Sequence, residues 1–176
     1  MKKKLITLLV VGIFFGLQSV RAQKQIEIIT PTAAFDVEMA MKMLNTGKSE
    51  IKGEAFSEER AGLIRRKIGD TIYARVGTVV TLYPVTPYLT EFFELRKKDK
   101  KGKRIAAISR EVNSFRILTK VYSLKGEFVF KGLAPGKYYV ETEVTFPSGI
   151  GGVEISGIAE IKTDGETVNV TLKRTF

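Results

Sequence analysis

Residues 128–144 read FVFKGLAPGKYYVETEV, and this stretch decides the fold. Phe128 and Phe130 lie two positions apart, so both rings point to the same side of an extended chain. A turn built from Gly132, a proline and Gly136 follows, and the next residues alternate tyrosine or aliphatic side chains with polar ones. The pattern predicts a β-hairpin with one buried face. We therefore expect these residues to form core and turn rather than a binding site.

Similar strand signals occur through most of the chain. Short runs rich in β-branched and aromatic residues are separated by glycine, proline or aspartate turns, with little helix between them. This spacing indicates an antiparallel β-sandwich. Gly53, inside the first run, suggests a β-bulge or a close backbone approach. The expected strands cover residues 49–56, 71–85, 116–123, 127–133, 137–146, 153–162 and 166–174.

Residues 32–45 instead show a helical pattern. Their apolar side chains fall largely on one side of a 3.6-residue wheel, and this face is expected to pack on the domain. Thr30 and Pro31 form a plausible N-cap and first-turn pair, and Gly47 stands just past the end.

A second helix is predicted within the strand-rich region. Thr86 is a candidate N-cap, Pro87 suits the first helical position, and the lysines that follow the helix lie where the helix dipole favours them. Residues 99–114 then form a basic connection that is irregular or partly helical. The inserted helix and its basic loop together span residues 86–114.

The N-terminus has the pattern of a secretory signal peptide. Three lysines precede an apolar run of 13 residues, Leu5 to Leu17, and small residues lead up to Ala22. This run is shorter than the roughly 20 residues that cross a bilayer as a helix. We expect cleavage after Ala22, with an uncleaved anchor as the alternative. The predicted organisation is a signal peptide over 1–22, an N-terminal segment with a helix over 23–48, and a β-sandwich over 49–176.

The basic character of the chain is local. The whole chain has a net charge of +10, and residues 23–176 hold 25 basic and 19 acidic residues, a net charge of +6. Residues 96–104 hold seven basic residues and one acidic residue, which is also a net charge of +6. A single charged loop is typical of a solvated face, and it does not provide the basic surface that nucleic-acid binding needs. We expect no nucleic-acid partner.

The segment from Gly126 to Val140 resembles the G-x-F-x-F-x-x-L-x-P-G-x-Y-x-V hairpin of carboxypeptidase regulatory-like domains. These domains are transthyretin-like, or prealbumin-like, β-sandwiches, related in fold to carbohydrate-binding-like and Cna-B-type domains. The resemblance covers about residues 49–174. It implies a mainly β protein, an antiparallel seven-stranded transthyretin-like sandwich with an N-terminal helix and one inserted helix, and it implies little about function.

The composition excludes most catalytic chemistry. The chain has no histidine and no cysteine, which rules out Ser-His-Asp and Cys-His catalysis and the usual nitrogen and sulfur metal sites. The enzymes of the resembled fold, intradiol dioxygenases and hydroxyisourate hydrolases, rely on histidine. Acidic residues are too scattered for a calcium loop. We expect a protein that is not an enzyme and has no cofactor or metal.

Two weaker possibilities concern side-chain pairs. A Cna-B-type isopeptide would join Lys52 to Asn169, but Glu141 falls one residue short of the position of the assisting glutamate, held here by Thr142, and so faces the other way. A carboxylate pair for glycoside hydrolysis would need two facing acids, and Glu91 with Glu94 is better explained as a solvated helix face.

These observations predict an exported, non-catalytic β-sandwich with a binding or structural role in the envelope, periplasm or extracellular space. One alternative is a carbohydrate-binding module, which would need exposed rings. Another is electrostatic docking on anionic lipid, polysaccharide or a partner protein, with peripheral contact and no membrane span in the mature chain. The candidate rings are Tyr73, Tyr83, Tyr88, Phe92 and Phe93. The candidate binding residues are Tyr88, Phe92, Arg96, Lys97, Lys98, Lys100, Lys101, Lys103 and Arg104.

Overall fold

The computed structural model describes residues 26–44, 47–58, 60–61, 66–67, 69–100, 102–147, 149 and 151–175. The predicted signal peptide, its cleavage after Ala22, and Lys101 of the basic loop lie outside these residues. No helix in the described part of the chain is long and apolar enough to span a membrane.

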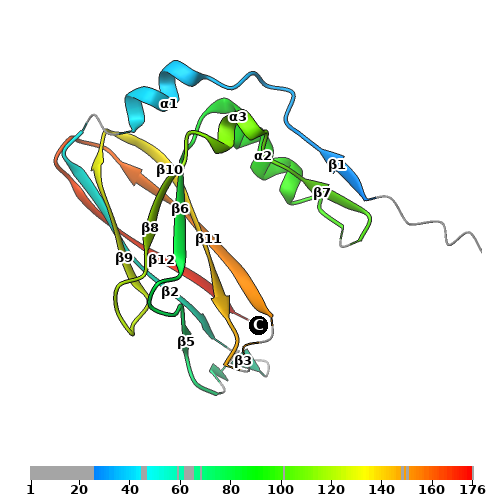
Figure 1. The fold of residues 1–176 in the computed structure, drawn as a ribbon, viewed down its shortest axis with the longest axis vertical. Coiled ribbons are helices and arrows are strands. Elements are labelled where there is room, and N and C mark those ends of the chain that lie inside the picture. The colour runs from blue at the N-terminus through cyan, green and yellow to red at the C-terminus, as the bar shows by residue number, and fades with distance from the viewer. Residues whose placement is uncertain are drawn as a thin grey trace, which may run out of the picture.

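Two packed sheets form the body of the molecule, as expected for a mainly β sandwich (Figure 1). The β10 sheet has the spatial order β11 (Gly152–Ile161), β10 (Gly136–Thr145), β6 (Val79–Pro84) and β8 (Ile117–Lys120). The β2 sheet has the order β12 (Thr167–Thr175), β2 (Ser49–Glu58) and β5 (Ile72–Tyr73), and β9 (Glu127–Leu133) also pairs with β2. A short hairpin, β3 (Arg60–Ala61) with β4 (Arg66–Lys67), lies apart from both sheets.

One pairing within the sandwich differs from the antiparallel pattern that the sequence predicts. β12 runs parallel to β2, with Asn169 opposite Lys52, whereas the other pairs in the two sheets are antiparallel. A parallel pair requires a long connection, and here the whole of the rest of the sandwich supplies it. The long run over 71–85 is also divided, because the chain leaves β5 through a turn at Gly77 before β6 begins.

The hairpin at 128–144 forms the centre of the core, as its alternation predicts. Phe128, Phe130 and Leu133 are buried on the inner face of β9, and Tyr138 and Val140 are buried on β10. The Tyr138 hydroxyl lies 2.7 Å from the carbonyl oxygen of Met43 and 2.6 Å from that of Ala134, so its single proton can be donated to either.

Gly53 is a point of close packing, as the sequence suggests. The ring of Phe128 lies directly against it, and a Cβ added at Gly53 would be 2.2 Å from the nearest ring atom. The register irregularity of β2 lies elsewhere, between Ser49 and Glu50. The glycine therefore makes room for a side chain rather than marking a bulge.

The first helix is shorter than predicted. α1 spans Val37–Met43, and Asp36 is its N-cap, accepting a hydrogen bond of 2.8 Å from the backbone N–H of Met39. The prediction of Thr30 and Pro31 as the cap is wrong. The residues before Asp36 do not join the helix. The chain bends at Ala33, and the N–H groups of Thr32 and Ala33 donate to the Glu91 carboxylate of α2, at 3.0 and 2.8 Å.

Only part of the predicted apolar face of α1 is covered. Ala40 and Met43 are buried, whereas Met39 and Met41 are exposed.

The hydrogen bonds from Thr32 and Ala33 also favour the ionised form of the Glu91 carboxyl. Backbone hydrogen bonds from Ala33 and then Thr32 hold the pKa of the Glu91 carboxyl below its ordinary value, which suits a structural anion rather than a catalytic acid.

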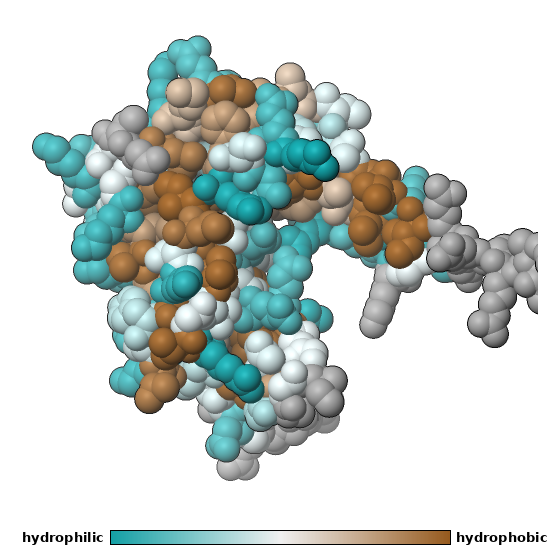
Figure 2. Space-filling view, in the orientation of Figure 1, coloured by the Kyte–Doolittle hydropathy of each residue, from teal (hydrophilic) through white to brown (hydrophobic). Residues whose placement is uncertain are grey.

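The inserted region contains the predicted second helix, a short strand and a third helix. α2 spans Pro87–Arg96 with Thr86 at the N-cap, and α3 spans Arg110–Asn113. Between them, β7 (Arg104–Ala106) pairs in parallel with β1 (Glu27–Ile29). Figure 1 shows the helices over one end of the sandwich and these two strands, which we name the β1–β7 ribbon, projecting from that end. In Figure 2 apolar residues gather on this projection.

Candidate functional site

The aromatic residues of α2 are used for packing. Tyr88 and Phe92 are buried with Leu89 in a second apolar cluster, which also contains Tyr83 and Tyr139 from the outer face of the β10 sheet. The Tyr88 hydroxyl accepts a hydrogen bond of 3.0 Å from the backbone N–H of Ser109. Two predicted binding residues, Tyr88 and Phe92, therefore lie where α2 covers the sheet, and neither ring is open to a ligand.

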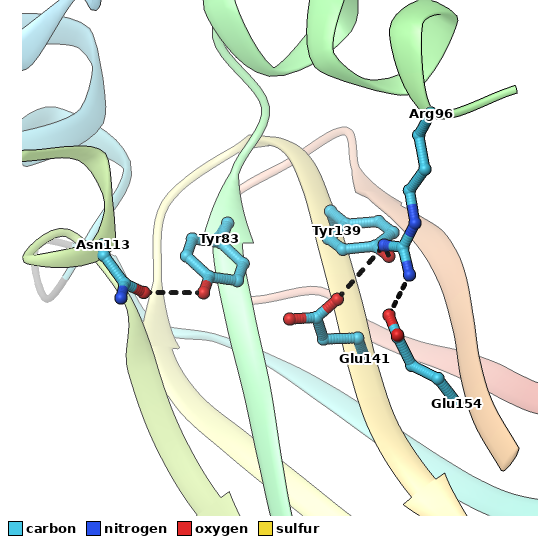
Figure 3. A network of polar contacts seen from close by, with 6 residues as sticks. All are labelled: Tyr83, Arg96, Asn113, Tyr139, Glu141 and Glu154. Carbon is cyan, nitrogen blue, oxygen red and sulfur yellow. Dashed lines mark hydrogen bonds and ion pairs between the residues drawn. The ribbon is translucent and has the colours of Figure 1, made fainter. Parts of the chain in front are cut away.

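Arg96 extends from the last turn of α2 onto the β10 sheet (Figure 3). One of its nitrogens, Nη1, donates to the Tyr139 hydroxyl at 2.6 Å and lies 3.5 Å from Oε2 of Glu141. The other, Nη2, pairs with Glu154 on β11. Nearby, the Tyr83 hydroxyl donates to Oδ1 of Asn113 at 2.9 Å. Arg96 thus attaches the end of α2 to two strands.

Burial controls the ionisation of this network. Desolvation raises the pKa of the Glu141 carboxyl, and the charge of Glu154 raises it further, while the Tyr139 hydroxyl and Arg96 act in the opposite direction. Burial likewise raises the pKa of the Tyr139 hydroxyl, which keeps its proton at neutral pH. Glu141 and Glu154 are a facing carboxylate pair, but both bind Arg96. The pair is an ion-pair network and not an acid with a free nucleophile.

Replacing Glu141 by glutamine should change how stability depends on pH. Because the folded-state pKa is raised above the ordinary 4.5, Glu141 contributes stability below that value and loses it as pH rises through the folded pKa. The melting temperature of Glu141→Gln relative to the unsubstituted protein should therefore increase with pH. Thermal melts between about pH 4 and about pH 8 would measure this. Glu160→Gln, at an exposed site on β11 six residues beyond Glu154, is the control, and a difference independent of pH would contradict the assignment.

The six predicted basic residues that the structure describes do not form one patch. Arg96 is paired with Glu141 and Glu154. Lys97 pairs with Glu94 at 2.5 Å, and Arg104 donates to the carbonyl of Lys98 at 2.8 Å. Three exposed lysines remain around the turn, and their binding role stays a prediction. They are Lys98, Lys100 and Lys103.

A groove on the opposite side of the sandwich combines groups that sequence reasoning did not connect. It lies on the outer face of the β2 sheet, and we name it the Tyr122 groove. The Tyr122 ring, 59% exposed, stands beside it in the turn between β8 and β9. Its lining residues are Lys52, Gly53, Glu54, Tyr122, Glu127, Asn169, Val170 and Thr171.

Strand register positions the polar groups of the Tyr122 groove. Asn169 of β12 lies opposite Lys52 of β2, and Glu54 lies between Thr171 and Glu127 of its two neighbouring strands. The Thr171 hydroxyl is 3.3 Å from Oε1 of Glu54. Because side chains alternate along a strand, these residues share the solvent face while Ile51 and Ala55 enter the core. The open surface beside the Tyr122 ring is therefore lined by five polar groups. They are one ammonium, one amide, one hydroxyl and two carboxylates.

The structure does not support an isopeptide between Lys52 and Asn169. Although the two residues are register partners, both are exposed, and the Lys52 ammonium is 3.5 Å from Oε2 of Glu50. Glu141 lies in the other sheet and binds Arg96. This exposed pair therefore lacks the low-dielectric surroundings that the reaction needs.

The sequence analysis did not identify Tyr122 as a candidate binding residue, because it lies near the end of residues 116–123, which the sequence pattern assigns to a strand. β8 stops at Lys120, and the chain then turns through Gly126, with the N–H of Tyr122 donating to the carbonyl of Glu127. The available signal was the following Ser123 and the Lys125-Gly126 pair, which favour a turn. Of the predicted candidate rings, Tyr73 is exposed but outside the groove lining, and Tyr83 is buried.

The described residues contain no cluster of acidic side chains arranged to hold a metal ion. Neither a protein-family model nor a curated protein sequence matches the chain. Among solved structures, it is similar to a proposed carbohydrate-binding protein from Pseudomonas aeruginosa, with a TM-score of 0.59 over 83% of this chain and 100% of that chain. The two sequences are 16% identical, so the likeness shows a shared β-rich fold alone.

Proposed function

We propose that this protein is an exported, non-catalytic carbohydrate-binding β-sandwich, and that the Tyr122 groove is its binding surface. The observation that carries the proposal is an exposed ring beside a row of hydrogen-bonding side chains on a rigid sheet face. A sugar ring has an apolar face that stacks on an aromatic side chain and hydroxyls that both donate and accept. The Tyr122 groove offers both kinds of contact.

The chemistry of the lining suits a polysaccharide better than other ligands. The groove is open, and most of its lining residues are polar, with Lys52 as donor, Glu54 and Glu127 as acceptors, and Asn169 able to do both. An extended sugar chain can lie along such a surface, whereas an apolar small molecule would need an enclosed pocket. Export is supported by the lysines and apolar run before Ala22, and the absence of histidine and cysteine supports a role without catalysis. The partner would be an envelope or extracellular polysaccharide.

Substituting Tyr122 by alanine should weaken polysaccharide binding about tenfold or more, since a stacked ring contributes about 1.5 kcal/mol beyond the surrounding hydrogen bonds. The measurement is migration in native gels cast with a neutral glucan, a xylan or an anionic alginate. Because Tyr122 is exposed in a turn, the variant should remain folded. Tyr73→Ala removes an exposed ring outside the groove and is the matched control. Equal retardation of both variants and the unsubstituted protein would reject the Tyr122 groove, and no retardation in any gel would reject these sugars as ligands.

A further inference from the structure

The β1–β7 ribbon has two chemically different faces. In its parallel pairing Ile28 lies opposite Ile105, so these two side chains share a face, while Ile29 and Ala106 share the other. Ala106 packs against the apolar cluster under α2. The face that carries Ile28 and Ile105 therefore points away from the domain.

That outward face is apolar. Ile28 is 65% exposed and Ile105 is 40% exposed, and Ile26, which has the same parity as Ile28, is 44% exposed. Isolated exposed isoleucines are ordinary, but here Ile28 lies opposite Ile105, and Figure 2 shows apolar residues gathered on the projecting ribbon. Exposing these apolar side chains to water does not stabilise the ribbon.

Exposed ammonium groups lie in the turn beside β7. Lys103 is exposed in this turn, immediately before Arg104, the first residue of the strand. Lys98 and Lys100 are exposed in the turn that leads into the strand, and the backbone of Lys100 bridges to Arg104. With the described residues, none of these three lysines forms an ion pair.

We propose that the β1–β7 ribbon docks this protein on the surface of an anionic phospholipid bilayer. The three isoleucines would enter the boundary between headgroups and acyl chains, and the three lysines would contact lipid phosphates. Apolar side chains flanked by lysines are the combination that this boundary favours. An anionic polysaccharide would use the lysines alone, because it offers no apolar phase to receive the isoleucines.

The place of the ribbon in the chain agrees with this partner. Ile26 comes four residues after the predicted cleavage site at Ala22, so the ribbon is the first element of the described part of the chain and follows closely on the proposed leader. The contact is distinct from the Tyr122 groove, which lies on the β2 sheet. Docking through the ribbon would leave that groove open to polysaccharide.

Vesicle sedimentation tests the proposal with the chain from Gln23 onward, which lacks the apolar leader and keeps every described residue. Vesicles of phosphatidylglycerol with phosphatidylcholine should bind the protein, pure phosphatidylcholine should not, and binding should weaken with salt. Replacing the three lysines by glutamine should lower the partition coefficient about 100-fold, since each lysine near an anionic surface contributes about fivefold. Ile28→Thr with Ile105→Thr should lower it about tenfold while keeping strand preference.

Matched variants separate the ribbon from general charge and hydrophobicity. Lys120, Lys125 and Lys162 replaced by glutamine remove the same charge elsewhere, and Ile158→Thr removes an equally exposed isoleucine from β11. Both controls should bind as the unsubstituted protein does. All ribbon variants should keep their retardation in the gels cast with the neutral glucan or the xylan, so failure of docking and failure of sugar binding are distinguishable.

An introduced tryptophan reports insertion directly, because the chain has none of its own. The emission of Ile28→Trp should shift to the blue on anionic vesicles and be quenched by brominated lipid, whereas Ile158→Trp should do neither. If the lysine variant loses binding but the threonine pair does not, and Ile28→Trp shows no shift, the ribbon is a polyanion site and the proposal is wrong. Absence of binding to anionic vesicles would also overturn it.

Discussion

Replacing Phe128 by alanine should lower the free energy of unfolding by about 4 kcal/mol. The ring is fully buried between the sheets, and it contacts the ring of Phe130 edge-on at 6.0 Å between centroids. Its removal leaves a cavity that the surrounding strands cannot close, because β9 and β10 are held by their ladders. Urea unfolding followed by tyrosine fluorescence would give the change in midpoint and slope. A loss below about 1 kcal/mol would contradict this packing.

A double substitution tests the contact between Phe128 and Gly53 itself. Gly53→Ala alone should cost about 2 kcal/mol or more, because its Cβ would lie 2.2 Å from the buried ring. In the Phe128→Ala background the same methyl group enters the cavity left by the ring. The cost of Gly53→Ala should then fall to near zero, giving a coupling energy of about 2 kcal/mol. Strictly additive effects would show that the ring does not rest on Gly53.

Replacing Arg96 by methionine should destabilise the protein by about 2 kcal/mol. The substitution keeps the apolar stem but leaves Glu141 and Glu154 facing each other without a cation. Removing one partner of a fully buried pair costs more, and the value is reduced here because the Arg96 side chain is 32% exposed. Thermal and urea unfolding at neutral pH would measure the loss.

Lys97→Met is the matched control for Arg96. It lies at the same end of α2, and its ion pair with Glu94 joins side chains that are 69% and 61% exposed. The expected cost is below about 0.5 kcal/mol. Amide hydrogen exchange should also separate the two variants, because only Arg96→Met releases the end of α2 from the sheet. Equal stability losses would show that Arg96 is no more than a surface charge.

The parts of the fold that could be predicted are those encoded by neighbouring residues. The hairpin at 128–144 combines alternating burial with turn glycines, and Gly132 has the positive φ of 75° that such a turn needs. The start of α2 at Pro87 follows from the local preference of proline for the first helical turn, although the hydroxyl of Thr86 at the N-cap makes no capping hydrogen bond.

What the sequence did not predict depends on distant partners. The start of α1 moves to Asp36 because Glu91, far along the chain, binds the residues before it. The parallel direction of β12 is a property of its pairing with β2, and alternation within a strand carries no such information.

The candidate site shows the same limit. Arg96 belongs to a basic run, but its direction is set by Tyr139 and two acids on strands that only the fold brings near. Tyr88 and Phe92 are aromatic residues of the kind that occur on binding surfaces, but on α2 both rings pack against the sheet. The Tyr122 groove combines residues from a turn and three strands, so no contiguous motif could reveal it.

The parallel position of β12 also sets the order in which the molecule can fold. β2 takes its neighbour on one side from a strand 117 positions later, for example where Thr171 meets Glu54. Contacts of such high sequence separation form slowly, and here they require the last strand of the chain. During synthesis the sandwich stays open until its C-terminal residues are available. For the export that we propose, this topology would keep the sandwich from closing before its last strand is available.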